Sequence, residues 1–220
     1  MGYRTVADIF SQISGVYDRF LSLATLGRIH SWQRDLVKDM GKGGNWLDVG
    51  TGTGEVLLKL GEDYEGLKVG LDPAEGMVFS AKVKCAKCGF VIAVAEDLPF
   101  KEGTFSRISL SLVFRHLQDQ NRFLREAGRV LKDEGVLGII DIGRFRGTGA
   151  VLLLMRTVLR PLGTLVFGRE KWEFFIRSVE ESYTVGEVVS LLEKNGFRVL
   201  KVRRRMLGTV FIITARKTAL

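Results

Sequence analysis

The sequence contains few of the residues that bind metals or form disulfides. It has two cysteines and two histidines in 220 residues. Cys85 and Cys88 form a single C-x-x-C motif, which is half of a zinc site or a redox pair. No second C-x-x-C and no neighbouring histidine completes a zinc site, so no metal centre is expected. The expected state is two thiols on successive turns of a helix in a reducing cytosol.

Long apolar runs are also missing. No stretch reaches about 18 uncharged apolar residues, the length that predicts a membrane-spanning helix. The first ten residues, MGYRTVADIF, lack a basic segment followed by an apolar one, so we expect no signal peptide. We therefore expect a cytoplasmic protein, with contact at a membrane surface as a further option.

Charge is unbalanced, with 33 Lys and Arg against 25 Asp and Glu and a net charge of +8. Such a surplus favours an anionic partner, namely nucleic acid, an anionic membrane or a phosphorylated ligand. A basic surface that is merely solvated explains it equally well. The chain is long enough for one hydrophobic core and shows no linker, so a single domain over residues 1–220 is expected.

The middle of the chain alternates between short apolar runs and amphipathic segments, which predicts a parallel sheet with helices on both faces. Strands are expected at 46–50, 67–72, 90–95 and 136–141 and within 104–114, and helices at 55–60, 75–87 and 121–132. Residues 3–41 show helical spacing, which Gly15 and Gly27 interrupt.

The carboxyl end predicts a helix that stops at Asn195-Gly196, then strands at 197–204 and 209–215. Two strands with so short a connection must pair antiparallel. The predicted fold class is α/β, with a Rossmann-like, seven-stranded, mostly parallel sheet that ends in an antiparallel hairpin, the variant used by methyltransferases. The expected segments are an N-terminal helical cap (1–43), a cofactor-binding core (44–143), a substrate lid (144–182), and a C-terminal helix and hairpin (183–220).

The stretch LDVGTGTGE (47–55) places a glycine loop between the first strand and the next helix. Glycines at 50, 52 and 54 let the backbone turn tightly and approach a ligand. The spacing is not G-x-G-x-x-G, because the third glycine of that dinucleotide pattern would fall at Glu55 or Leu57. A carboxylate at Glu55 would also oppose a pyrophosphate.

A G-x-G-x-G loop that follows Asp48 suits S-adenosylmethionine, which carries a cationic amino group and a sulfonium but no phosphate. Asp72 ends the second strand, where a carboxylate can accept hydrogen bonds from both ribose hydroxyls. The alternative is a glycine turn without a ligand, and Asp72 in register argues against it.

With these motifs the chain resembles class I S-adenosylmethionine-dependent methyltransferases. The resemblance rests on the glycine loop and on residues 70–77, 96–108 and 123–141. More narrowly, the chain resembles the UbiE-type C-methyltransferases of ubiquinone and menaquinone biosynthesis. That narrower likeness rests on residues 14–37, 160–168 and 172–182.

The resemblance implies S-adenosylmethionine as cofactor, S-adenosylhomocysteine as product and a lipophilic quinol as acceptor. The expected cofactor-binding residues are Asp48, Gly50, Thr51, Gly52, Gly54, Asp72, Pro73, Met77, Glu96, Asp97 and Ser111. Where the family has an Asp or Asn for the adenine amino group, this chain has Val94, so Glu96, Asp97 or the backbone is expected there. The resemblance also implies a homodimer.

Carbon methylation of a quinol needs a base for the hydroxyl and a cation to stabilise the phenolate. We expect His116 to be the base and Arg115 the cation, since both follow the fourth strand. Tyr17, Asp18 and Asp141 would shape or polarise the site. His116 stands where the family has Asn. Alternatives are that His116 only lines the pocket, that Arg115 forms a surface salt bridge, and that Tyr17-Asp18 joins helices.

Residues 148–168 are apolar with two arginines, which fits a lid, an interfacial helix on anionic lipid or a pair of core helices. Competing functions are methylation of another small molecule, methylation of RNA, and cofactor binding without catalysis. No nucleic-acid partner is expected, because the sequence lacks an Asp/Asn-Pro-Pro-aromatic motif, a Pro-Cys nucleophile and an added RNA-binding domain.

Overall fold

A computed structural model of the chain describes residues 21–22, 25 and 27–218. In that part, seven strands form one sheet in the order β3-β2-β1-β4-β5-β7-β6. Their bounds are β1 Trp46–Val49, β2 Lys68–Leu71, β3 Gly89–Val91, β4 Phe105–Ser111, β5 Leu131–Ile142, β6 Phe197–Arg205 and β7 Val210–Lys217. The first five strands are parallel and β7 is antiparallel to both neighbours, which confirms the predicted fold class.

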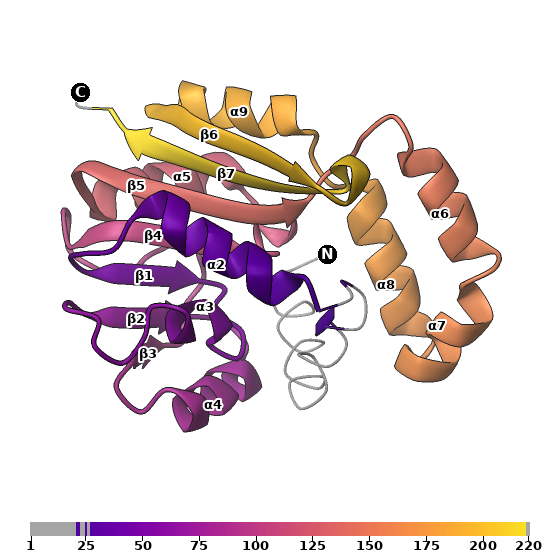
Figure 1. Cartoon of the computed structure of the whole chain (residues 1–220), viewed down its shortest axis with the longest axis horizontal. Coiled ribbons are helices and arrows are strands. Elements are labelled where there is room, and N and C mark those ends of the chain that lie inside the picture. The colour runs from indigo at the N-terminus through magenta and orange to yellow at the C-terminus, as the bar shows by residue number, and fades with distance from the viewer. Residues whose placement is uncertain (1–20, 23–24, 26, 219–220) are drawn as a thin grey trace.

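Helices cover both faces of the sheet (Figure 1). They are α2 Ile29–Met40, α3 Glu55–Leu58, α4 Glu75–Lys84, α5 Gln120–Val130, α6 Thr148–Arg156, α7 Arg160–Phe167, α8 Arg169–Glu180 and α9 Val185–Lys194. Two short 3-10 helices are η1 Phe114–His116 and η2 Met206–Gly208. One core cluster joins the sheet to α5 and α9, and a second joins it to α2 and α3. Helices α6, α7 and α8 stand together beyond the carboxyl ends of the parallel strands (Figure 1).

Helix α2 crosses the sheet in close contact with β5. A Cβ atom on Gly138 would lie 2.3 Å from the Met40 sulfur and 2.8 Å from a Leu36 methyl carbon, so only glycine permits this approach. The expected helix break at Gly27 is present, with a φ of 72° immediately before α2. The break expected at Gly15 lies outside the described residues.

The prediction of two free thiols is wrong, because Cys85 and Cys88 form a disulfide. The predicted helix over 75–87 ends at Lys84, and Cys85 leaves the helical conformation with φ −127° and ψ 83°. The turn that follows brings the two Cα atoms to 5.4 Å, within the range that a disulfide spans.

Two strand boundaries also differ from the prediction. The strand expected over 90–95 is paired only over Gly89–Val91, and Val94 to Glu96 form a loop instead. This loop reaches the pocket described below. Strand β5 starts at Leu131 rather than 136, because helix α5 ends at Val130 and the backbone of Leu131 is already extended.

Candidate active site

A pocket lies at the carboxyl ends of β1, β2 and β4, where ligands bind in open α/β sheets. Nine of the eleven expected cofactor residues line it: Asp48, Gly50, Thr51, Gly52, Asp72, Pro73, Met77, Glu96 and Ser111. Gly54 and Asp97 are not among the lining residues. Gly54 instead starts α3, where an added Cβ would lie 3.3 Å from Ala81, and Asp97 is exposed.

The glycine loop holds Asp72 by backbone hydrogen bonds. Gly50 and Gly52 have φ values of 64° and 53°, and a Cβ on Gly50 would collide with Val113 at 2.3 Å. The Gly52 N–H donates to one carboxylate oxygen of Asp72 over 2.9 Å, and the Ala74 N–H donates to the other over 2.8 Å. Each oxygen keeps a further lone pair for a ligand hydroxyl.

Two buried carboxyl groups line the pocket, and burial raises the pKa of both. The pKa of Asp72 rises to about 6, although the two backbone donors lower it in part. The pKa of Asp48 rises to about 7 because of burial, against the Ser109 hydroxyl that donates to it over 2.6 Å. The neighbouring charge of Asp72 adds to this rise. A cationic ligand would stabilise both anions, so these residues fit S-adenosylmethionine.

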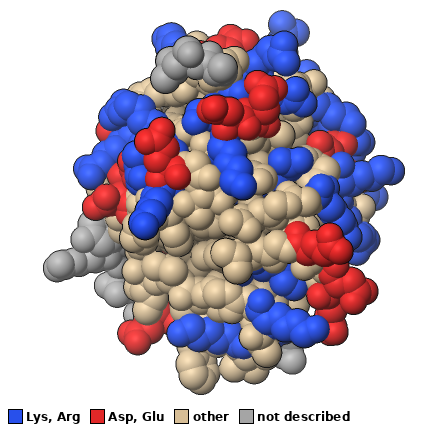
Figure 2. Space-filling view, turned by 90° about the vertical axis from the view of Figure 1, so that its left-hand side faces the viewer, with Lys and Arg blue, Asp and Glu red and all other residues tan. Residues whose placement is uncertain are grey.

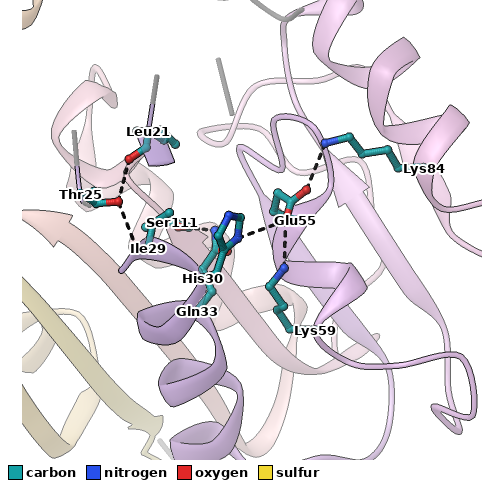
Figure 3. A network of polar contacts seen from close by, with 9 residues as sticks. All are labelled: Leu21, Thr25, Ile29, His30, Gln33, Glu55, Lys59, Lys84 and Ser111. Atoms are coloured by element: carbon teal, nitrogen blue, oxygen red, sulfur yellow. Dashed lines mark hydrogen bonds and ion pairs between the residues drawn. The ribbon is translucent and has the colours of Figure 1, made fainter. Parts of the chain in front are cut away.

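Glu55 lines the same pocket but is already neutralised by cations (Figure 3). Its carboxylate is 2.9 Å from Lys59 Nζ, 3.0 Å from Lys84 Nζ and 3.5 Å from His30 Nδ1. Although burial raises the pKa of Glu55, the two lysines lower it overall. The two lysine ion pairs and the His30 contact tie α2, α3 and α4 together at the glycine loop.

Helix α2 and Leu21, which precedes it, reach the pocket. Gln33 Nε2 donates to the Ser111 hydroxyl over 3.3 Å, and Gln33 and Leu21 both line the pocket. The Thr25 hydroxyl donates to the Leu21 carbonyl over 2.6 Å and accepts from the Ile29 N–H over 3.2 Å, which fixes the start of α2 (Figure 3). Neither Gln33 nor Leu21 lies in a sequence motif that would have predicted its place in the pocket.

Arg115 and Asp141 form an ion pair beside the pocket rather than in it. The side chains are 7% and 1% exposed, and neither lines the pocket. The Arg115 guanidinium contacts Asp141 and donates to the Leu112 carbonyl over 3.1 Å. The Arg115 backbone N–H also donates to Asp141 over 2.9 Å. The pair thus holds the turn after β4 against the end of β5.

His116 lines the pocket, as expected of a residue that meets the acceptor. Burial and the adjacent Arg115 charge hold the pKa of His116 well below its usual value, so the imidazole is neutral near pH 7. Its ring stacks on Phe174 of α8, with centroids 5.4 Å apart and planes 13° from parallel. Tyr17 and Asp18, the other expected catalytic residues, lie outside the described residues.

Further lining residues were not predicted: Val49, Thr53, Val56, Leu71, Ala74, Ala95, Leu112, Val113, Leu117 and Gln118. Most of them flank the predicted residues along the chain. The glycine loop and the ends of β1, β2 and β4 therefore could have indicated them, because neighbours in a loop share its edge of the sheet.

The face at the other end of the parallel strands carries charges of both signs. Figure 2 shows Lys and Arg intermixed with Asp and Glu there, around an uncharged area. The positive charge of the chain is therefore not gathered into one continuous basic patch on this face, as a nucleic-acid footprint would be.

The sheet order, the glycine loop and the acidic residue that ends β2 define an S-adenosylmethionine-dependent methyltransferase. The chain matches the ubiE/COQ5 methyltransferase family over residues 1–217 and belongs to that family.

Named relatives agree with this membership. The chain is 30% identical over 225 residues to the ubiquinone/menaquinone biosynthesis C-methyltransferase UbiE of Geobacter sulfurreducens, covering 96% of this chain and 88% of that one. It is 27% identical over 212 residues to the demethylmenaquinone methyltransferase of Chlamydia pneumoniae, covering 93% and 92%. A solved SAM-dependent methyltransferase from Aquifex aeolicus is 26% identical with a TM-score of 0.59, covering 84% and 88%.

Proposed function

We propose that this enzyme transfers a methyl group from S-adenosylmethionine to a ring carbon of a lipophilic quinol in menaquinone or ubiquinone-type biosynthesis. The observation that carries the proposal is the extent of the family match, residues 1–217. The match includes the helical cap and the lid segment as well as the cofactor-binding core. The parts of the chain that would surround an acceptor therefore share the family's pattern.

When bound, S-adenosylmethionine supplies a methyl group already activated on a sulfonium. In this chain Asp72 would accept the ribose hydroxyls, and the loop from Gly50 to Gly52 would pack against the remainder of the cofactor. Buried Asp48 would provide negative charge behind it. Glu96 and the backbone near Val94 lie in the pocket wall, where the adenine contact is proposed.

His116 is proposed as the general base. The neutral imidazole takes the proton of the acceptor hydroxyl, which leaves a phenolate whose ring carbon is nucleophilic. A carbon–carbon bond would form as the bond between sulfur and methyl breaks. The proton of that carbon would then pass to solvent, and the His116 imidazolium would return its proton to the ring oxygen. Because Arg115 is held by Asp141, we assign it a positioning role: it fixes η1, which carries His116.

Two finer parts of the proposal concern partners and location. A prenylated quinol resides in a bilayer, so we propose peripheral contact with a membrane. A homodimer and a cytoplasmic location stay predictions. The mass of the purified protein in solution tests the homodimer, and cell fractionation tests the cytoplasmic location.

A transfer assay separates the proposal from its competitors. The purified enzyme is incubated with S-adenosylmethionine labelled in the methyl group, together with a lipid extract, total RNA or a water-soluble metabolite extract. We expect label in the lipid fraction, on a quinone. Label that appears only in RNA or only in soluble metabolites would contradict the proposal. The Asp72→Asn variant, which should bind the cofactor more weakly, shows how much of the labelling depends on cofactor binding.

A further inference from the structure

The lid segment carries an unusually apolar outer surface on α6, α7 and the turn between them. We call this the α6–α7 apolar surface, and it comprises Leu153, Leu154, Val158, Leu162, Leu165 and Val166. Leu153 is 64% exposed, Val158 69% and Leu165 83%. Six exposed aliphatic side chains within one short segment are more than scattered surface residues would give, and such gatherings mark interaction sites.

These side chains are not an extension of the lid's own core. The opposite faces of the two helices are already packed: Leu152 and Met155 of α6 are buried with Trp172 and Ile176 of α8. Helix α7 approaches α8 so closely that a Cβ on Gly163 would lie 2.3 Å from the Trp172 ring. The outward leucines are therefore unnecessary for holding the lid together.

The charges that the 148–168 segment itself carries are of one sign, although acids of α8 lie beside it. From 148 to 168 the sequence contains Arg156 and Arg160 but no Asp or Glu, and exposed Arg146 and Arg169 flank the segment. Arg156 and Arg160 pair with acids of α8, at 2.6 Å and 3.2 Å. An aliphatic surface with an arginine border matches the acyl chains and phosphates of an anionic bilayer.

A second copy of the chain fits this surface less well. A two-fold interface brings the same patch of each copy together. The exposed Arg146 and Arg169 of each copy would then add positive charge to one shared border, whereas Arg156 and Arg160 are already paired with Glu180 and Glu173. Charge complementarity thus favours lipid over self-association.

The helix geometry favours lying on a bilayer. Along the described residues no single helix is long and apolar enough to cross a membrane, but Thr148–Arg156 and Arg160–Val166 together have the required composition, with a bend of 66° between them. Helices α6 and α7 have 9 and 8 residues, and neither alone covers the hydrocarbon core of about 30 Å.

The surface also belongs to the same helical unit as the site. Helix α8 packs against both α6 and α7, and its Phe174 stacks on His116. Figure 1 shows the three helices side by side at the end of the molecule beyond the carboxyl ends of the strands. Docking here would therefore place the pocket near the bilayer.

We propose that the α6–α7 apolar surface docks on an anionic lipid bilayer. The inference rests on the proposed function only for its purpose, which is to bring a membrane-held quinol to the pocket; the docking itself requires neither cofactor nor catalysis.

The test is flotation of the full-length protein with phosphatidylcholine vesicles, with or without phosphatidylglycerol. We expect binding to the anionic vesicles, and a fall in the bound fraction of about tenfold or more in the triple variant Leu153→Gln, Leu162→Gln, Leu165→Gln. Arg146→Gln with Arg169→Gln should weaken binding to anionic vesicles and reduce its dependence on salt. The matched control is Phe79→Gln with Val83→Gln, two residues of α4 that are 70% and 74% exposed, and its binding should equal that of the wild type.

Three results would overturn the inference: wild-type protein that floats with neither vesicle, a triple variant that binds as well as the wild type, or a triple variant whose only change is loss of a dimer. Methylation of a short-chain, water-soluble quinol without lipid is measured in parallel. The triple variant should retain that activity, and its thermal midpoint should match the wild type. Absence of quinol methylation with intact vesicle binding would reject the proposed function alone.

Discussion

Asp48 is a carboxyl group that the protein buries completely at the rear of the cofactor pocket. Its pKa is about 7 in the folded chain, against 3.8 as the reference value. In the unfolded state the group ionises at lower pH, so the folded state binds more protons between about pH 4 and 7. Ionisation of Asp48 therefore destabilises the folded state. The free energy of unfolding is unaffected by this group below about pH 4 and falls as the pH rises toward 7.

Asp48→Asn removes this penalty while keeping an oxygen that accepts from Ser109. At pH 8 we expect the ligand-free variant to exceed the wild type in free energy of unfolding by about 4 kcal/mol, an order-of-magnitude value from the pKa shift. At pH 5 the difference should shrink. Urea denaturation at the two pH values measures this, and a difference that does not change with pH would contradict the account.

Asp72→Asn should weaken S-adenosylmethionine binding by about 10-fold to 100-fold, because a neutral amide replaces the anion that the ribose hydroxyls would contact. Wild-type affinity should rise as the pH passes about 6, where the carboxyl group ionises. Isothermal titration calorimetry measures both effects. Exposed Glu75→Gln is the matched control, since it removes a charge nearby without touching the pocket lining. Equal losses in both variants would mean that Asp72 acts only through net charge.

His116→Asn should lower kcat by about 100-fold, the contribution typical of a general base. Because burial and Arg115 hold the pKa of His116 low, the wild-type rate should fall only below pH 6.5 and stay level above it. The variant should lose that acidic limb. A pH profile of kcat with a water-soluble quinol shows this. An unchanged limb would make His116 a lining residue only.

Among the elements, the turn after β4 depends on a contact with the end of β5. Arg115→Leu leaves the buried Asp141 carboxylate without its cation, which typically costs about 3 kcal/mol or more. Asp141→Asn in the same chain should recover part of that loss, since the remaining charge is gone. Urea unfolding of both variants tests the positioning role. A loss of activity without loss of stability in Arg115→Leu would instead support direct contact with the acceptor.

The sequence predicted the sheet and the glycine loop well, because apolar alternation and loop glycines are local signals. The Arg115–Asp141 contact could also have been predicted. Asp141 lies at the end of the strand next to the one that Arg115 follows, and parallel neighbouring strands bring both ends to one edge of the sheet. What local patterns could not give is the stacking of Phe174 on His116, or the contact of Gln33 with Ser111, since both depend on how distant helices pack. The Cys85–Cys88 bond was missed because helical spacing over 75–87 hid the end of α4 at Lys84.

At the scale of the whole molecule, the pocket lies at the edge of the sheet, and helix α2 lines it through Gln33. Helix α8 does not line the pocket but supports it, since its Phe174 ring stacks on His116, which does. The net charge of +8 alone is compatible with three kinds of anionic partner, and the positions of the charged residues help to distinguish them. It is mixed with acids on the face of Figure 2, whereas residues 148–168 contain two arginines and no acid, and these arginines pair with Glu180 and Glu173 of α8.

The most direct test of the central claim is to locate the transferred methyl group. A demethylated quinone is reduced to the quinol in the reaction mixture and given to the enzyme with S-adenosylmethionine labelled in the methyl carbon. The product is analysed by mass spectrometry and carbon NMR. We expect one label on a ring carbon, at a rate that His116→Asn strongly reduces. Label on the quinol oxygen, or no label on the quinol at all, would contradict it.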